Sequence, residues 1–68
     1  MVKIDEELVV NLNGPDGNAF CIMGNVAHIM RQHGCSKEEV DEYTKAAMSS
    51  DYDNLLKVSG QVVNLVLV

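Results

Sequence analysis

A chain of 68 residues with a net charge of −5 at pH 7 has room for one small domain, which we place over residues 1–68. Ten acidic residues against five dispersed basic ones argue against a nucleic-acid partner and against an anionic membrane surface, because both attract clusters of Lys and Arg. Hydrophobic residues make up 47% of the chain, so we expect a packed core rather than disorder.

The predicted elements begin with a strand over residues 7–12, in which apolar side chains alternate between two faces. Residues 13–18 (NGPDGN) form a dense turn signal, in which Pro15 and Gly17 are expected to exclude any regular element. The turn leads directly into a periodic apolar segment. We therefore expect the turn to connect a strand to a helix.

The spacing of apolar residues predicts a first helix over residues 18–33, with Asn18 or Asp16 as its N-cap and Gly34 as its C-terminal stop. On the polar face lies Gly24, which costs about 1 kcal/mol relative to Ala inside a helix. This cost predicts a close approach to the backbone, either by another segment of this chain or by a second protein. The apolar half of the helix is expected to contain Ala19, Phe20, Ile22, Met23, Val26, Ala27, Ile29 and Met30.

Two shorter helices are predicted next. Residues 36–39 (SKEE) form a capping box that opens a helix over residues 36–48. A second Ser-x-x-acid pattern, from Ser50 to Asp53, opens a helix over residues 51–59 that Gly60 ends. The side chains expected to face the core are Val40, Tyr43 and Ala47 from one helix, and Tyr52, Leu55, Leu56 and Ser59 from the other.

A strand rich in β-branched residues is predicted over residues 61–68. The order is then β-α-α-α-β, which is an α+β fold: a small two-stranded sheet with three helices on one face. The spacing leaves open whether the two strands run parallel or antiparallel. It also leaves open whether dimerisation extends the sheet.

The last strand is apolar on both faces, with Val63, Leu65 and Leu67 on one of them. Because a lone pair of strands is marginal in water, these three residues are the predicted interface of a two-fold homodimer. The alternative is a cover from the same chain, in which Val2 and Ile4 lie over the strand.

The turn before the first helix is the candidate ligand site, with contacts from Gly14, Asp16, Gly17 and Asn18. Backbone N–H groups and the positive end of a helix dipole can hold a phosphate or a carboxylate there. The phosphate-binding pattern that adds a Lys is absent, and Asp16 would repel an anion. A plain connection from strand to helix is therefore the competing interpretation.

No catalytic or metal site is expected. The side chains that could bind a metal are Cys21, His28, His33 and Cys35, and they contain no C-x-x-C pair. Cys21 and His28 lie about two helical turns apart, which is too far for nucleophilic catalysis. Both cysteines are predicted to be free thiols, because the helix between them holds them about 20 Å apart. We expect no cofactor.

Free thiols, the lack of a signal peptide and the lack of a run of roughly 20 apolar residues together predict a cytoplasmic protein with no membrane contact. Residues 14–20 (GPDGNAF), between a short strand and an apolar helix, resemble small uncharacterised proteins of tailed bacteriophages and prophages. Residues 51–55 (DYDNL) are similar to theirs as well. The resemblance implies a phage or prophage gene expressed in a bacterial host, and it assigns no residue a role.

Two functions follow as hypotheses. The first is a non-enzymatic protein-interaction or regulatory module, whose partner is a host or phage protein. The alternative is a small protein that binds an anionic ligand at the turn of residues 14–18.

Overall fold

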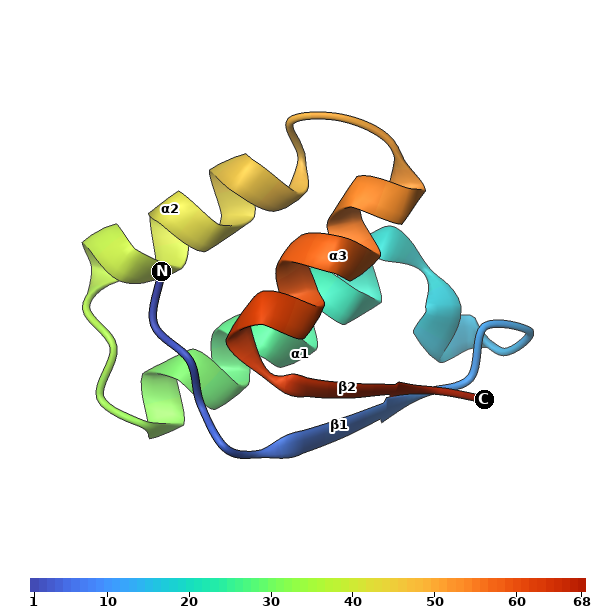
Figure 1. The fold of residues 1–68 in the computed structure, drawn as a ribbon, viewed down its shortest axis with the longest axis horizontal. Coiled ribbons are helices and arrows are strands. Elements are labelled where there is room, and N and C mark those ends of the chain that lie inside the picture. The colour runs from blue at the N-terminus through green and yellow to red at the C-terminus, as the bar shows by residue number, and fades with distance from the viewer.

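The computed structural model describes all of residues 1–68 and confirms the α+β class with the order β-α-α-α-β. Figure 1 shows the two strands side by side along one side of the molecule and the three helices on the other. The elements are β1 (Glu7–Val10), the short 3-10 helix η1 (Pro15–Gly17), α1 (Ala19–Gln32), α2 (Lys37–Ala47), α3 (Tyr52–Val62) and β2 (Asn64–Leu67).

The two strands run parallel, with Leu8 opposite Leu65 and Val9 opposite Val66. Single hydrogen bonds continue the pairing beyond both strand ends. At one end the Ile4 amide donates to the Val62 carbonyl (2.7 Å), and at the other the Leu12 amide donates to the Val68 carbonyl (3.1 Å). The first and last segments of the chain are therefore joined over their whole length. This pairing settles the direction that the sequence left open.

The helix ends follow the capping chemistry that the sequence predicts. The Phe20 amide donates to Asn18 Oδ1 (2.8 Å) at the start of α1. Ser36 and Glu39 exchange both bonds of the capping box at the start of α2. Gly34 follows α1 with a φ of 83°, a left-handed conformation that glycine adopts without strain.

Several predicted details are wrong, among them the start of the last strand, which begins at Asn64 rather than at residue 61. Pro15 begins the one-turn helix η1, because the first turn of a helix does not need the amide that proline lacks. The N-cap of α3 is Asp51 rather than Ser50, since Asp51 Oδ1 accepts from the Asn54 amide (3.0 Å). Gly60 lies inside α3, which continues to Val62 because burying this last turn outweighs one unfavourable glycine.

The C-terminal end of α3 is completed by the N-terminal segment. Lys3 Nζ lies 3.1 Å from the Gly60 carbonyl and 3.4 Å from the Val63 carbonyl. A cation at this position is favourable because the carbonyl end of a helix carries partial negative charge. The last turn of α3 has no basic residue of its own, so Lys3 supplies that charge from the opposite end of the chain.

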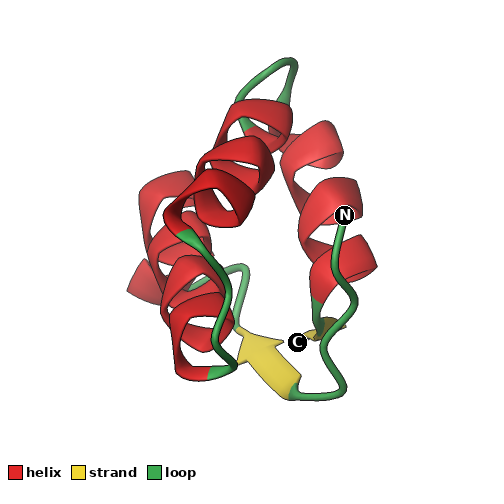
Figure 2. Cartoon of the chain, turned by 90° about the vertical axis from the view of Figure 1, so that its left-hand side faces the viewer, coloured by secondary structure: helices red, strands yellow, loops and turns green.

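Fifteen buried hydrophobic residues form the core between the helices and the sheet. All the predicted core residues of α2 belong to it, and so do six of the eight that were predicted for α1. The two exceptions are Ala19, which is half-buried, and Phe20. Phe20 is 72% exposed, so its prediction is wrong: it lies at the first turn of α1, where no other element packs over it. Figure 2 shows the helices above the two strands.

One polar pair lies inside the core, where the Tyr43 hydroxyl meets Ser59 Oγ at 2.6 Å. Both residues are fully buried, so each hydroxyl depends on the other for its hydrogen bond. Burial raises the pKa of Tyr43, and the hydrogen bond to Ser59 offsets part of this rise. The pair fixes α2 and α3 in one relative position.

Replacing Tyr43 with Phe leaves the Ser59 oxygen buried without its partner. We expect Tyr43→Phe to lower the free energy of unfolding by about 1–3 kcal/mol, the usual cost of an unpaired buried polar group. Removing both partners, in Tyr43→Phe/Ser59→Ala, should cost less than the two single substitutions added together. Urea unfolding of the four proteins measures this coupling, and strictly additive losses would contradict it.

The raised pKa of Tyr43 predicts how stability depends on pH at the alkaline end. The unfolded chain releases this proton near pH 10, whereas the folded chain keeps it to higher pH, so the unfolded state binds fewer protons there. The contribution of Tyr43 is complete below about pH 10 and is lost as the pH rises through the folded pKa. The Tm should therefore fall more steeply above about pH 10 in the wild type than in Tyr43→Phe, and equal slopes would show that Tyr43 is not responsible.

Candidate functional site

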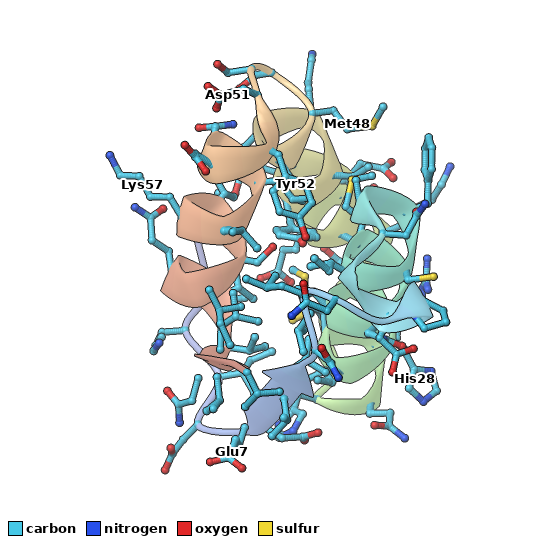
Figure 3. All side chains as sticks on the ribbon, turned by 90° about the vertical axis from the view of Figure 1, so that its right-hand side faces the viewer. Glu7, His28, Met48, Asp51, Tyr52 and Lys57 are labelled. Carbon is cyan, nitrogen blue, oxygen red and sulfur yellow. The ribbon has the colours of Figure 1, made fainter.

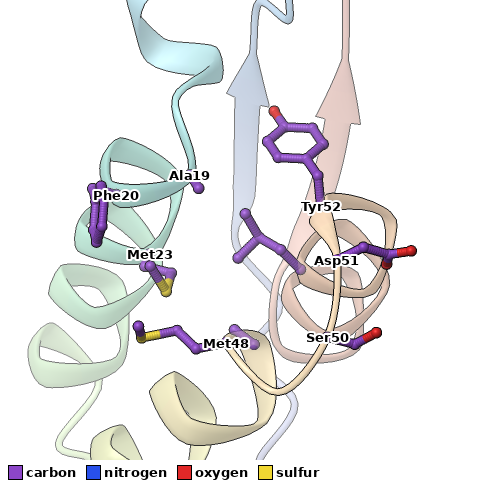
Figure 4. Close-up of a pocket in the computed structure, with 9 residues that line it drawn as sticks. Ala19, Phe20, Met23, Met48, Ser50, Asp51 and Tyr52 are labelled. Atoms are coloured by element: carbon purple, nitrogen blue, oxygen red, sulfur yellow. The ribbon is translucent and has the colours of Figure 1, made fainter.

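An apolar pocket of about 250 Å³ opens where the start of α1 meets the connection between α2 and α3. Seven of the nine residues that line it are hydrophobic. Figure 4 shows Met23 of α1 and Met48, which directly follows α2, close to each other on one side of the pocket, with Tyr52 on the opposite side. The lining residues are Ala19, Phe20, Met23, Ala47, Met48, Ser50, Asp51, Tyr52 and Leu55.

Hydrogen bonds hold the walls of the pocket in place. The Tyr52 hydroxyl donates to the Gly17 carbonyl and so joins α3 to the turn before α1. Asn54 Nδ2 donates to the Ala46 carbonyl (3.0 Å), which fixes the connection between α2 and α3. Figure 3 shows Tyr52 directed inward from α3, whereas Lys57 of the same helix points outward. The pocket is therefore part of the folded structure rather than a gap between loose segments.

Large hydrophobic side chains at the pocket are left in contact with solvent. Phe20 is 72% exposed and Met48 is 58% exposed, and Tyr52 is also exposed. Aromatic residues and Met are enriched where proteins bind other proteins, and the flexible Met side chain adapts to different partners. Sequence periodicity missed this site because it assigned Phe20 and Tyr52 to the core. Met48 lies just beyond the end of α2, and no pattern in the sequence indicated that it would be exposed at a pocket.

The predicted ligand residues Gly14, Asp16, Gly17 and Asn18 lie together in the turn beside this pocket. A Cβ atom at Gly17 would lie 2.9 Å from the carbonyl oxygens of both Asn11 and Leu12, so the turn requires glycine there for close packing. The Gly14, Gly17 and Asn18 amides all donate to carbonyls within the segment 11–18.

Three amides of this region, those of Asp16, Ala19 and Cys21, have no acceptor within the chain. They are the groups that an anion would meet at the start of α1. Ligand binding at the turn stays a prediction.

The three predicted interface residues of the last strand differ in their exposure to solvent, and so in whether a partner could contact them. Val63 is fully buried in the core of its own chain, which corrects its assignment to an interface. Val63 lies between the end of α3 and the start of β2, and its side chain belongs to the core cluster. Leu65 is half-buried, and Leu67 is 44% exposed at the end of the strand.

The outer face of the sheet is apolar and exposed at Val9, Val66 and Val68. The N-terminal residues Val2 and Ile4, the predicted alternative cover from the same chain, do not lie over these residues. Ile4 is buried in the core, and Val2 packs against the same cluster. The N-terminal segment therefore completes the core, while the outer face of the sheet stays open.

Both cysteines are free, as predicted: Cys21 is exposed on α1 and Cys35 is half-buried after it. Burial is the main cause that raises the pKa of the Cys35 thiol, and the nearby negative charge of Glu39 adds to it. His33 Nε2 lies 2.8 Å from Glu6 Oε1, which links the end of α1 to the N-terminal segment. No three His, Cys, Asp or Glu side chains are grouped closely enough to hold a metal ion.

Gly24 has open space where its Cβ would be, with no atom of the chain within 4 Å. The prediction that another segment of this chain approaches it is therefore wrong. Approach by a second protein stays a prediction.

Two glycine substitutions should change stability in opposite directions. Gly24→Ala introduces a better helix former into open space and should raise the free energy of unfolding by about 0.4–1 kcal/mol. Gly17→Ala should lower it by more than this amount, because the new Cβ collides with two backbone carbonyls. Urea denaturation of both variants tests the pair, and the packing argument fails if Gly17→Ala is as stable as the wild type.

No family model, curated protein or solved structure matches this chain. No helix combines the length and the apolar character that a membrane span requires.

Proposed function

We propose that this chain is a non-enzymatic protein-interaction module whose pocket receives an apolar side chain of a partner protein. The observation that carries the proposal is the pocket itself, a largely apolar hollow with Phe20, Met48 and Tyr52 exposed at its edge. Exposed residues of these types, grouped around a hollow, are typical of protein-binding surfaces.

The size of the pocket favours a single side chain as its occupant. A cavity of about 150 Å³ lined by aliphatic side chains holds benzene, whereas sites for drug-sized ligands and cofactors occupy about 300–1,000 Å³. The pocket lies between these limits at about 250 Å³. It can accommodate one aromatic or large aliphatic group that another protein presents.

The polar groups at the pocket support binding rather than catalysis. The Tyr52 hydroxyl donates to the Gly17 carbonyl, and the Asp51 carboxylate caps α3 by accepting from the Asn54 amide. Both groups therefore already serve the fold. The chain's charge of −5 further favours a partner whose binding surface is basic.

The proposed partner is a host or phage protein, in keeping with the resemblance of residues 14–20 to phage proteins. Self-association as a homodimer is a second part of the proposal. The alternative function, binding of an anionic ligand at the turn, draws on the free amides of Asp16, Ala19 and Cys21.

A neutral aromatic probe tests the pocket directly. We expect 2-phenylethanol to shift the methyl NMR signals of Met23 and Met48, which line the pocket, and to leave those of Met1 and Met30 unchanged. Ala19→Leu, which fills the pocket, should weaken this binding by about tenfold or more, the effect of losing about 1.4 kcal/mol. Cys21→Leu, an exposed position of the same helix outside the lining, is the matched control.

Two outcomes would count against the proposal. Equal shifts at all four Met methyl groups would show binding that is not specific to the pocket. The second outcome is that inorganic phosphate shifts the amides of Asp16, Ala19 and Cys21 while 2-phenylethanol shifts no methyl signal. That result would favour the anion-binding function instead.

A further inference from the structure

The sheet has only two strands, so each strand has one edge with no neighbour. On β2, the Asn64 amide donates to Glu6 (2.9 Å) and the Val68 amide donates to Val10 (2.9 Å). Because alternate residues of a strand direct their backbone groups to the same side, Leu65 and Leu67 direct theirs away from β1. No hydrogen bond outside the ladder uses these groups. The outer edge of β2 therefore presents two free N–H and two free C=O groups.

The two edges of the sheet differ in charge. Glu7 places a carboxylate on β1, and charged side chains are a common device that protects a strand edge from pairing. The two acidic residues before it are already engaged, because Asp5 Oδ1 accepts from Asn64 Nδ2 (2.8 Å) and Glu6 Oε1 lies 2.8 Å from His33 Nε2. Residues 64–68 (NLVLV) contain no charge, no proline and no glycine. β2 itself thus carries no charged side chain, whereas β1 carries Glu7.

The free groups of β2 complement those of a second copy. When two identical strands meet antiparallel across a two-fold axis at Val66, Leu65 of each copy faces Leu67 of the other. These are hydrogen-bonded pairs of an antiparallel ladder, so all eight free groups of the two copies form bonds. Val66 then lies opposite its symmetry mate in the closely spaced, non-hydrogen-bonded pair.

We infer that two copies of this chain join through the outer edges of β2 and form one four-stranded sheet in the order β1-β2-β2-β1. This inference deepens the proposed interaction role and rests on it, because it names a second copy of the chain as one partner. It removes the exposed edge of an uncharged strand and converts an isolated strand pair into a sheet of ordinary size. The two-fold arrangement is closed, so association stops at the dimer.

Val66 and Val9 provide a matched pair of substitutions, because they are paired neighbours on the same exposed face. Val66→Lys places two like charges directly opposite each other at the proposed axis, whereas Val9→Lys places them on the outer strands. By sedimentation equilibrium at about 100 μM, a concentration well above a micromolar Kd, we expect dimeric wild type, dimeric Val9→Lys and monomeric Val66→Lys. Circular dichroism and thermal unfolding establish that both variants are folded.

A cysteine pair gives a second readout that does not depend on disrupting the dimer. In a Cys21→Ser background, Val66→Cys should form a disulfide-linked dimer in a glutathione redox buffer, because its Cβ atoms face each other across the axis. Val9→Cys should remain largely monomeric on a non-reducing gel.

A monomeric wild type at about 500 μM would overturn the inference, because it would place any Kd in the millimolar range. So would equal loss of the dimer in both lysine variants, which would show that the faces of two sheets pack together instead. The response of the Met23 and Met48 methyl groups to 2-phenylethanol, measured in monomeric Val66→Lys, is independent of these results. Failure of the edge contact is thereby distinguished from failure of the proposed pocket.

Discussion

The parallel pairing of the first and last segments of the chain is the contact on which the rest of the structure depends. It extends from the bond between Ile4 and Val62 to the bond between Leu12 and Val68, and it joins residues more than fifty positions apart. Closing so large a loop costs entropy that the strand bonds alone do not repay. This entropy cost is offset by the three helices, which bury their apolar faces against each other and against the inner side of the sheet.

The same arrangement explains why interaction surfaces remain. A chain of this length has enough helix to cover one face of a two-stranded sheet, so the outer face and both edges are left open. Parallel sheets are almost always covered on both faces, which makes this exposure unusual. The pocket beside Phe20 and Met48 opens elsewhere, where the start of α1 meets the connection between α2 and α3. Of the two proposed contact sites, the pocket leaves apolar side chains uncovered, and the outer edge of β2 leaves backbone N–H and C=O groups without partners.

Much of the local structure could be predicted because it depends on neighbouring residues. Asn18, Ser36 with Glu39, and Gly34 act within one helical turn, and their roles are those that the sequence indicates. The core faces of α1 and α2 follow from periodicity for the same reason. The candidate pocket could not be predicted this way. Its lining comes from three segments, and the exposure of Phe20 depends on what lies opposite it in space.

The sequence by itself determined the α+β class, the order of the elements, the caps of the first two long helices and the two free thiols, because each follows from spacing along the chain. Tertiary structure alone decided the parallel direction of the strands, the extension of α3 through Gly60 and the burial of Val63. Each of these depends on packing against distant residues: Ile4 and Lys3, from the opposite end of the chain, complete the end of α3. Local preference near Gly60 favoured ending the helix, and burial of Val62 and Val63 outweighed it.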